Sequence, residues 1–148
     1  MRTLVLVLVS MLGLSCGAPP AGEPALDLDA GRPTCTRTDP RVGWFAELST
    51  KAHGVRGRVT LTDACTLTLS DFTYDGGGLD VRLVLAPAMT GFARGTPVGP
   101  QLLRGGGYQN ETLLLAIPPG LALSDLERVS VWCVAADADF GSGTFRAP

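Results

Sequence analysis

Apolar and polar residues alternate along several short stretches of the chain, and most of these stretches end at glycine, proline or aspartate. The stretch 129–134 places Val129, Val131 and Cys133 on one face of a strand and Trp132 on the other. Such an alternation is typical of a β-strand with one buried face. Because this strand carries a cysteine, the role of Cys133 is the main question that the sequence raises.

A hairpin is expected between residues 55 and 70, because two alternating stretches flank the turn 62–64. Its inward face is expected to consist of Val55, Gly57, Val59, Leu61, Cys65, Leu67 and Leu69. The glycine loop 75–78 follows, and it requires positive backbone φ angles. Another strand is expected after it, with an inward face formed by Leu79, Val81, Leu83 and Leu85.

The rest of the chain predicts fewer regular elements. Continuous apolar residues predict a fully buried strand over 112–117, which two prolines then stop. The segment 87–107 is rich in glycine and proline, and only 101–103 is expected to form a short strand there. A single helical turn is expected at 124–127, and residues 143–145 are expected to close the sheet.

Short strands, abundant glycine and few aromatic residues indicate an all-β protein. We therefore expect a single antiparallel β-sandwich or barrel-like domain over residues 35–148, a usual length for one domain with its own core. The sequence has no internal repeat and no long amphipathic helix that would favour another fold class.

The N-terminal segment predicts export. Residues 4–14 are apolar and uncharged but too short to span a bilayer, which takes roughly twenty residues, so residues 1–15 are expected to be a signal peptide. The sequence around Cys16 resembles a bacterial lipobox, which implies lipidation of Cys16; ordinary cleavage near Ala18 is the alternative. Residues 16–34 are rich in proline, glycine and alanine and are expected to be a flexible linker.

Charge and motifs exclude several functions. The net charge is −2, and it becomes about −3 once the signal peptide is removed, so a nucleic-acid partner is not expected. The chain contains neither a phosphate-binding loop nor a nucleotide fingerprint, and no serine-hydrolase motif. Independent catalytic activity is therefore not expected.

Four cysteines occur in the chain, and three remain if Cys16 is lipidated. An exported protein permits disulfides, and one internal bridge would leave one free thiol. Cys35 with Cys65 would close a loop of about thirty residues, whereas Cys65 with Cys133 would join two inward-facing positions. If Cys133 is free, its chemistry alone favours a small buried apolar residue whose pKa is raised by burial.

Several short motifs occur in a characteristic order: His53-Gly54-Val55-Arg56-Gly57, Asp71-Phe72-Thr73-Tyr74-Asp75-Gly76, Leu79-Asp80, Ser130-Val131-Trp132-Cys133 and Asp139-Phe140-Gly141. From about Cys35 to its end, the chain resembles the DM-thirteen electron-transfer domain, an extracellular all-β module. The resemblance implies an electron-transfer role in which Cys133 is the redox group, as a thiol or through a prosthetic group such as haem. It also favours pairing of Cys35 with Cys65.

The resemblance assigns motif positions to His53, Gly57, Phe72, Tyr74, Asp75, Gly76, Asp80, Trp132, Phe140 and Gly141. One departure is Leu79, since the family usually has proline between this glycine and aspartate. Family members often carry cytochrome domains as well, and this chain has none, so an electron partner would be another protein.

Each candidate residue also has a structural interpretation. His53 is the one histidine, so a haem would need Met89 or Cys133 as its second ligand; a hydrogen-bonding role is the alternative. Asp71, Asp75 and Asp80 could surround a calcium ion, but aspartates beside glycines more often cap turns. Trp132 is expected to pack in the core, and a partly exposed binding aromatic is the alternative. The sequence therefore assigns no metal and no cofactor to this protein. Haem is the one cofactor that its residues leave as an alternative.

Our leading hypothesis is a lipid-anchored domain of the bacterial cell envelope that transfers electrons or exchanges thiols at Cys133. Its partner would be an unidentified envelope redox or surface protein. The alternative is a non-catalytic binding or adhesion module in which Cys133 is buried and inert. A carbohydrate-binding module is a third hypothesis, and it would expose an aromatic platform at Trp44, Tyr74 or Tyr108.

Overall fold

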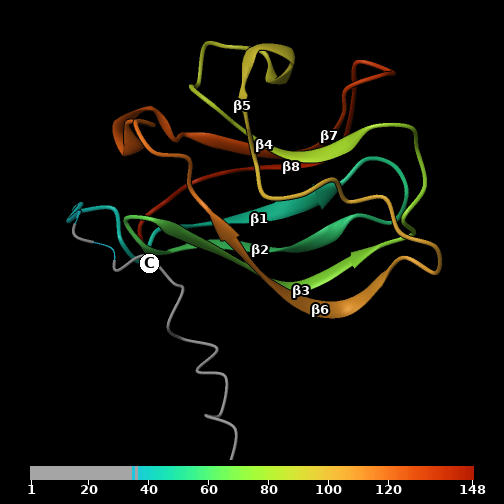
Figure 1. Ribbon diagram of the computed structural model, residues 1–148, viewed down its shortest axis with the longest axis horizontal. Coiled ribbons are helices and arrows are strands. Elements are labelled where there is room, and N and C mark those ends of the chain that lie inside the picture. The colour runs from blue at the N-terminus through green and yellow to red at the C-terminus, as the bar shows by residue number, and fades with distance from the viewer. Residues whose placement is uncertain (1–34, 36) are drawn as a thin grey trace, which may run out of the picture. The chain divides into compact units, whose positions relative to one another are not determined.

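The computed structural model describes residue 35 and residues 37–148 (Figure 1). This part of the chain folds into eight antiparallel strands and two short 3₁₀ turns. The elements are β1 (Phe45–Thr50), β2 (Arg56–Asp63), β3 (Thr66–Tyr74), β4 (Val81–Ala86), η1 (Phe92–Arg94), β5 (Thr96–Val98), β6 (Tyr108–Ala116), η2 (Leu123–Asp125), β7 (Arg128–Cys133) and β8 (Ala138–Thr144). The predicted all-β fold class is confirmed.

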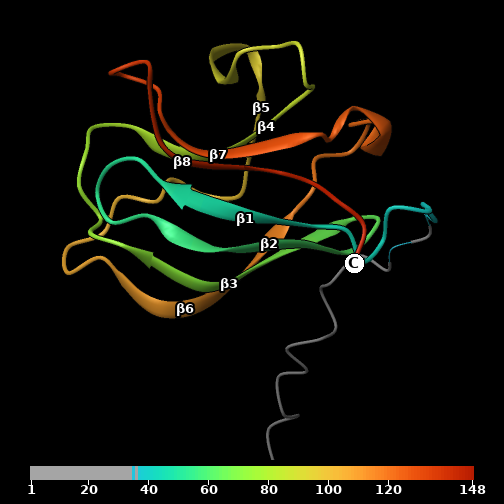
Figure 2. The same cartoon turned by 180° about the vertical axis from the view of Figure 1, so that it is seen from behind.

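The strands form one continuous sheet in the order β5-β4-β7-β8-β1-β2-β3-β6. The sheet curls into a half-barrel, so that β4, β7 and β8 face β2, β3 and β6 across the core (Figures 1 and 2). β1 joins the two halves, because it pairs with β2 on one side and with β8 on the other. The domain is therefore a curled sheet with sandwich-like layers.

Inward-facing apolar residues of both halves form one core. The expected inward residues Val55, Val59, Leu61, Leu67 and Leu69 are all buried, which confirms the alternation in the β2–β3 hairpin. A second, smaller cluster lies on the outer face of the sheet. It consists of Val84, Ala86 and Phe92, with Trp132 packed against them.

Three sequence predictions of local structure are wrong. Leu79 does not continue the inward alternation of β4; it lies in the preceding loop and is 75% exposed. The short strand in the glycine-rich segment is at 96–98, not at 101–103. The strand containing 112–117 is not fully buried: because β6 is an edge strand with one outer face, Leu114 is 57% exposed while Leu115 is buried.

Two further predictions need refinement. The expected helical turn at 124–127 is a 3₁₀ turn over Leu123–Asp125, with Ala122 at the N-cap position instead of Ser124. The expected closing strand at 143–145 overlaps the end of β8 (Ala138–Thr144), which lies inside the sheet between β7 and β1. The predicted signal peptide, the lipidation of Cys16 and the linker lie outside the described residues. Within the described residues, no helix has the length and apolar character needed to cross a bilayer.

Candidate functional site

Cys133 is the last residue of β7, and it lies opposite Val81 of β4 in the sheet register. Among the described residues it is the free cysteine, and only 2% of its surface is exposed. Three connections meet at this end of the sheet: residues 51–55 between β1 and β2, residues 75–80 between β3 and β4, and residues 134–137 between β7 and β8. Their contacts define the candidate site.

The backbone N–H groups of Leu79 and Asp80, before β4, and of Ala135 and Ala136, after β7, favour a negative charge on the Cys133 sulfur. Burial raises the pKa of the Cys133 thiol, but these N–H groups lower it by more, so its pKa lies below the ordinary value. Converging backbone N–H groups are an anion-binding arrangement. The thiolate is therefore stabilised by peptide dipoles, with no neighbouring cation required.

The segments that cover the sulfur are themselves at the surface. Leu79 is 75% exposed and Val134 is 49% exposed. The N–H of Val134 donates a 2.7 Å hydrogen bond to the carbonyl of Asp80, which joins the two segments over the thiol. A reagent that displaces this turn would reach Cys133, whereas the closed arrangement shields it.

A cluster of aromatic rings lies next to the thiol. Tyr74 is fully buried, and its pKa is raised to about 12 by burial and then by the nearby charges of Asp75, Cys133 and Tyr108. Its hydroxyl donates a hydrogen bond to the carbonyl of Gly77. The Tyr74 and Tyr108 rings are stacked with centroids 6.2 Å apart. Tyr74 therefore stays protonated at neutral pH. Its hydroxyl holds the glycine loop 75–78 in place through Gly77.

His53 packs at the edge of this cluster. Its ring lies 4.2 Å from the ring of Phe140, and its Nδ1 lies 2.9 Å from Oδ2 of Asp75. Asp75 also accepts the N–H of Gly77 at 2.8 Å, and this bond, followed by that of His53, lowers the pKa of the Asp75 carboxyl. These contacts agree with a hydrogen-bonding role for His53. Asp75 caps the turn of the glycine loop.

The three aspartates considered for calcium do not share one site in the described structure. Asp75 is engaged by His53 and Gly77. Asp80 accepts hydrogen bonds from the side chains of Arg82 and Gln101, and Asp71 is exposed. The carboxylates of Asp75 and Asp80 serve separate local contacts.

The disulfide joins Cys35 to Cys65, with their Cα atoms 5.7 Å apart, so the alternative pairing of Cys65 with Cys133 is wrong. Cys65 lies in the β2–β3 turn at the end of the sheet opposite to Cys133. Ligand atoms of Cys35, Cys65 and Asp63 are close enough together to hold a metal ion, but the two sulfurs are bonded to each other. This group is therefore a structural bridge.

The residues considered as haem ligands do not meet in a cavity. Met89 is 97% exposed and follows the far end of β4, whereas His53 and Cys133 lie near the start of that strand. Open hollows of about 350 and 400 Å³ lie on the outside of the sheet, and neither is lined by any of these three residues. The described side chains do not fit a haem bound between them.

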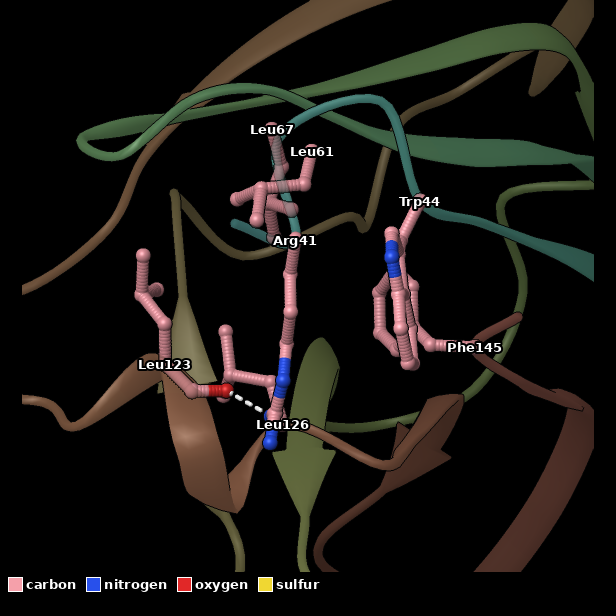
Figure 3. A pocket seen from close by; sticks show the side chains of 7 residues that line it. All are labelled: Arg41, Trp44, Leu61, Leu67, Leu123, Leu126 and Phe145. Atoms are coloured by element: carbon pink, nitrogen blue, oxygen red, sulfur yellow. Dashed lines mark hydrogen bonds between the residues drawn. The ribbon is translucent and has the colours of Figure 1, made fainter. Parts of the chain in front are cut away.

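The opposite end of the sheet is closed by side chains. The space between Arg41, Trp44 and Phe145 amounts to about 10 Å³ (Figure 3). Arg41 crosses it, donating a hydrogen bond to the carbonyl of Leu123 and lying 5.5 Å from the Trp44 ring. Tyr74 and Tyr108 are buried, so the expected carbohydrate platform does not exist at these two tyrosines.

Most of the motif residues gather around the thiol end of the sheet. His53, Tyr74, Asp75 and Phe140 contact one another, and Phe72 packs on Tyr108 with ring centroids 5.0 Å apart. Gly76 has a φ of +79°, and a Cβ there would lie 2.1 Å from the carbonyl oxygen of Arg104. The motif glycines Gly57 and Gly141 also leave no room for a Cβ. It would meet the carbonyl oxygen of Ser70 at Gly57 and the side chain of Val55 at Gly141. The expectation that Trp132 packs in the main core is wrong: it is partly exposed and packs against the smaller outer cluster.

Sequence reasoning missed the N–H groups that surround the thiol. It looked for lysine, arginine or a second cysteine near Cys133, and none is present in the neighbouring sequence. The donors come from Leu79, Asp80, Ala135 and Ala136, whose side chains carry no sign of this role. Only the glycine loop 75–78 indicated that backbone segments pack closely against one another at this end of the sheet.

The structure defines an all-β domain with a free, shielded thiol whose pKa is lowered by backbone N–H groups. The family described as electron transfer DM13 matches residues 47–145, and the chain belongs to this family. Protein Skeletor of Drosophila melanogaster is a curated relative: isoforms B/C and isoforms D/E are each 29% identical over 96 residues, which cover 60% of this chain. The match spans 12% and 6% of those proteins, respectively. No match to a solved structure reaches significance.

Proposed function

We propose that this protein is an exported, membrane-tethered electron-transfer domain whose redox group is the Cys133 thiol. Membership of the electron-transfer family supports the general role. The observation that carries the assignment to Cys133 is a free thiol at the end of β7 whose negative charge is favoured by backbone N–H groups of the two neighbouring connections. A lower thiol pKa gives more thiolate at neutral pH, and the thiolate is the form that reacts in thiol exchange.

The reaction that this site favours is thiol–disulfide exchange with a partner protein. The Cys133 thiolate attacks one sulfur of a partner disulfide, a bond forms between the two sulfurs, the partner's own S–S bond breaks, and its second sulfur leaves as a thiolate. A donor protein with two thiols then attacks the Cys133 sulfur and displaces the reduced partner. Its second thiol closes the donor disulfide and releases Cys133, so two electrons pass from donor to partner.

Burial of Cys133 has a consequence for this reaction. The exposed turn 134–137 must move aside before another sulfur can reach the thiol, so exchange requires this turn to open transiently in the folded protein. The Cys35–Cys65 bridge lies at the other end of the sheet and does not resolve the mixed disulfide. The donor dithiol therefore has to be supplied by another protein.

Membrane attachment is supported by the sequence of residues 1–16. The apolar segment and the lipobox-like sequence before Cys16 fit a lipidated N-terminus in the bacterial envelope. Mass spectrometry of the N-terminal peptide from the membrane fraction tests this, with Cys16→Ala as the variant that should be absent from that fraction. An unmodified Cys16, or an uncleaved segment before it, would contradict the tether.

The decisive test of the redox assignment uses the full chain with Cys16→Ser, which leaves Cys133 as the free thiol. The rate of alkylation by iodoacetamide is measured against pH, and the kinetic pKa should lie below about 8.5, the ordinary value for cysteine. A soluble aromatic disulfide should also form a mixed disulfide with Cys133 in the folded protein. Reaction only after unfolding would overturn the redox assignment.

A second candidate function is a non-catalytic binding module, and the 2% exposure of Cys133 is the observation that favours it. In that case Cys133→Ala should leave every biological function of the protein intact. The alkylation experiment separates the two candidates, because a binding module does not require a thiol that reacts in the folded state.

A further inference from the structure

A hollow of about 350 Å³ lies on the outer face of the sheet, on the side of β4 and β7 that faces away from the core. Its second wall is the segment of η1 and β5, which stands over these strands (Figures 1 and 2). Trp132 and Arg82, which are opposite each other in the β4–β7 register, form its floor. This volume is at the lower end of the range for small-molecule sites, which is roughly 300 to 1,000 Å³.

Trp132 provides an aromatic surface in this hollow. Its ring lies 5.8 Å from the ring of Phe92, and Phe92 is in turn covered by the guanidinium of Arg128 at 4.4 Å. Phe92 is 6% exposed, whereas Trp132 remains partly exposed. The indole is thus held in place from one side and has apolar surface left for a ligand.

Three charged side chains line the hollow beside the indole: Asp80, Arg82 and Asp137. Oδ1 of Asp80 accepts hydrogen bonds from Nε of Arg82 at 2.9 Å and from Nε2 of Gln101 at 3.0 Å. These contacts fix the carboxylate and leave the terminal amino groups of Arg82 able to donate to a ligand. The hollow therefore presents oriented acceptors and donors next to an apolar face.

The charges select the chemical class of the ligand. One guanidinium between two carboxylates gives no positive field for a phosphate or another anion. A sugar ring carries hydroxyls that donate and accept around its edge, and it has an apolar face of C–H groups. Carboxylates and guanidinium groups bind neighbouring hydroxyls in pairs, and an indole face packs on the C–H groups.

We propose that the hollow between β4, β7 and the η1–β5 segment is a saccharide-binding site, with one sugar ring stacked on Trp132 and its hydroxyls bonded to Asp80, Arg82 and Asp137. The proposal does not require the redox role of Cys133, whose side chain lies on the other face of β7, although Asp80 and the turn 134–137 border both sites. The ligand class is a neutral oligosaccharide, of which one or two rings occupy the hollow.

The test is a tryptophan-fluorescence titration of the full chain with cellotriose, maltotriose and the trimer of N-acetylglucosamine. At least one sugar should produce a saturable change. The chain has two tryptophans, so Trp44→Phe is a matched control at the other end of the sheet, and it should retain the response. Trp132→Phe should abolish the fluorescence response, and calorimetry should show an affinity weaker by roughly tenfold.

A second variant keeps the conclusion secure if Trp132→Phe folds poorly. Asp137 is exposed and has a φ of +51°, a conformation that asparagine also tolerates, so Asp137→Asn should fold normally. It should weaken binding by roughly threefold to tenfold, because a hydrogen bond to a charged group is lost. The proposal is overturned if no sugar binds, if inorganic phosphate binds instead, or if Asp137→Asn and Trp132→Phe bind with unchanged affinity. Cys133→Ser should bind the sugar normally, so the two proposals can fail separately.

Discussion

The backbone N–H of Asp80 lowers the pKa of the Cys133 thiol, although the two residues are far apart in the sequence. The carbonyl of the same aspartate holds the turn after β7 through the N–H of Val134. One peptide segment therefore stabilises the thiolate and also keeps it covered. Reactivity and protection of the thiol depend on the same few backbone groups.

The first prediction concerns stability against pH. The pKa of Cys133 is lower in the folded protein than in the unfolded chain, so ionisation contributes stability that is fully present above about pH 8.5 and is lost as the pH falls through the folded pKa. In the Cys16→Ser chain, the free energy of unfolding in urea should rise with pH up to about 8.5. Cys133→Ala should lack this part of the rise. An identical pH profile for both proteins would contradict the lowered pKa of Cys133.

The second prediction concerns Leu79, where related domains usually have proline. Proline has no N–H, so Leu79→Pro removes one donor from the Cys133 sulfur. The kinetic pKa should rise, and alkylation at pH 7 should slow by roughly tenfold. Leu79→Ala is the matched control, since it removes the exposed side chain but keeps the N–H, and it should react like the parent. Equal rates in the two variants would mean that this N–H does not act on the sulfur.

The third prediction concerns the Cys35–Cys65 disulfide. Its chain loop of 30 residues should stabilise the domain by about 3 to 4 kcal/mol through the entropy of the unfolded chain. Urea unfolding with and without a reductant measures this difference. The double variant Cys35→Ser with Cys65→Ser should show a similar loss and should no longer respond to the reductant. A response that persists in this variant would place the effect elsewhere.

The fourth prediction concerns acid stability. Burial raises the pKa of the Asp139 carboxyl, but hydrogen bonds from Lys51, Ser130 and Ser142 lower it by more. Its contribution is therefore present above about pH 3.9, the unfolded value, and is lost as the pH falls through the lower folded pKa. Asp139→Asn should destabilise the protein at pH 7 and should flatten the stability profile below about pH 4.

A matched control for this prediction is Asp71→Asn. Asp71 is exposed and has a φ of +52°, which asparagine tolerates, so the substitution should change stability little. Ser130→Ala should resemble Asp139→Asn at neutral pH, since the buried Ser130 hydroxyl donates to Oδ1 of Asp139 at 2.8 Å. Equal acid sensitivity of Asp139→Asn and its parent would assign the acid transition to another carboxyl.

The strands that the sequence predicted correctly are those whose two faces differ in polarity. Val59 and Leu61 on β2, and Val129 and Val131 on β7, face one buried core, so period-two alternation located both strands. β1 was not assigned from its sequence. It joins the two halves of the sheet, and its position is set by pairing with two strands that are distant in the chain.

The candidate site was predictable only in part. The motif order pointed to Cys133, His53 and Tyr74, and the fold brings the connections that carry them to one end of the sheet. The lowered pKa of Cys133 could not be anticipated, because it depends on backbone N–H groups whose direction is set by turn geometry. A search of the sequence for charged neighbours cannot detect such donors, because they belong to the backbone.

The Cys35–Cys65 bridge also determines how the domain transmits mechanical load. Cys35 precedes the first strand by ten residues, and the bridge carries a pull on that side directly into the β2–β3 turn. Tension therefore reaches inner strands through a covalent bond, and it bypasses β1 and the loop 51–55 that leads to His53. A domain held from its N-terminal side can therefore bear tension while the structure around the thiol, at the opposite end of the sheet, stays unchanged.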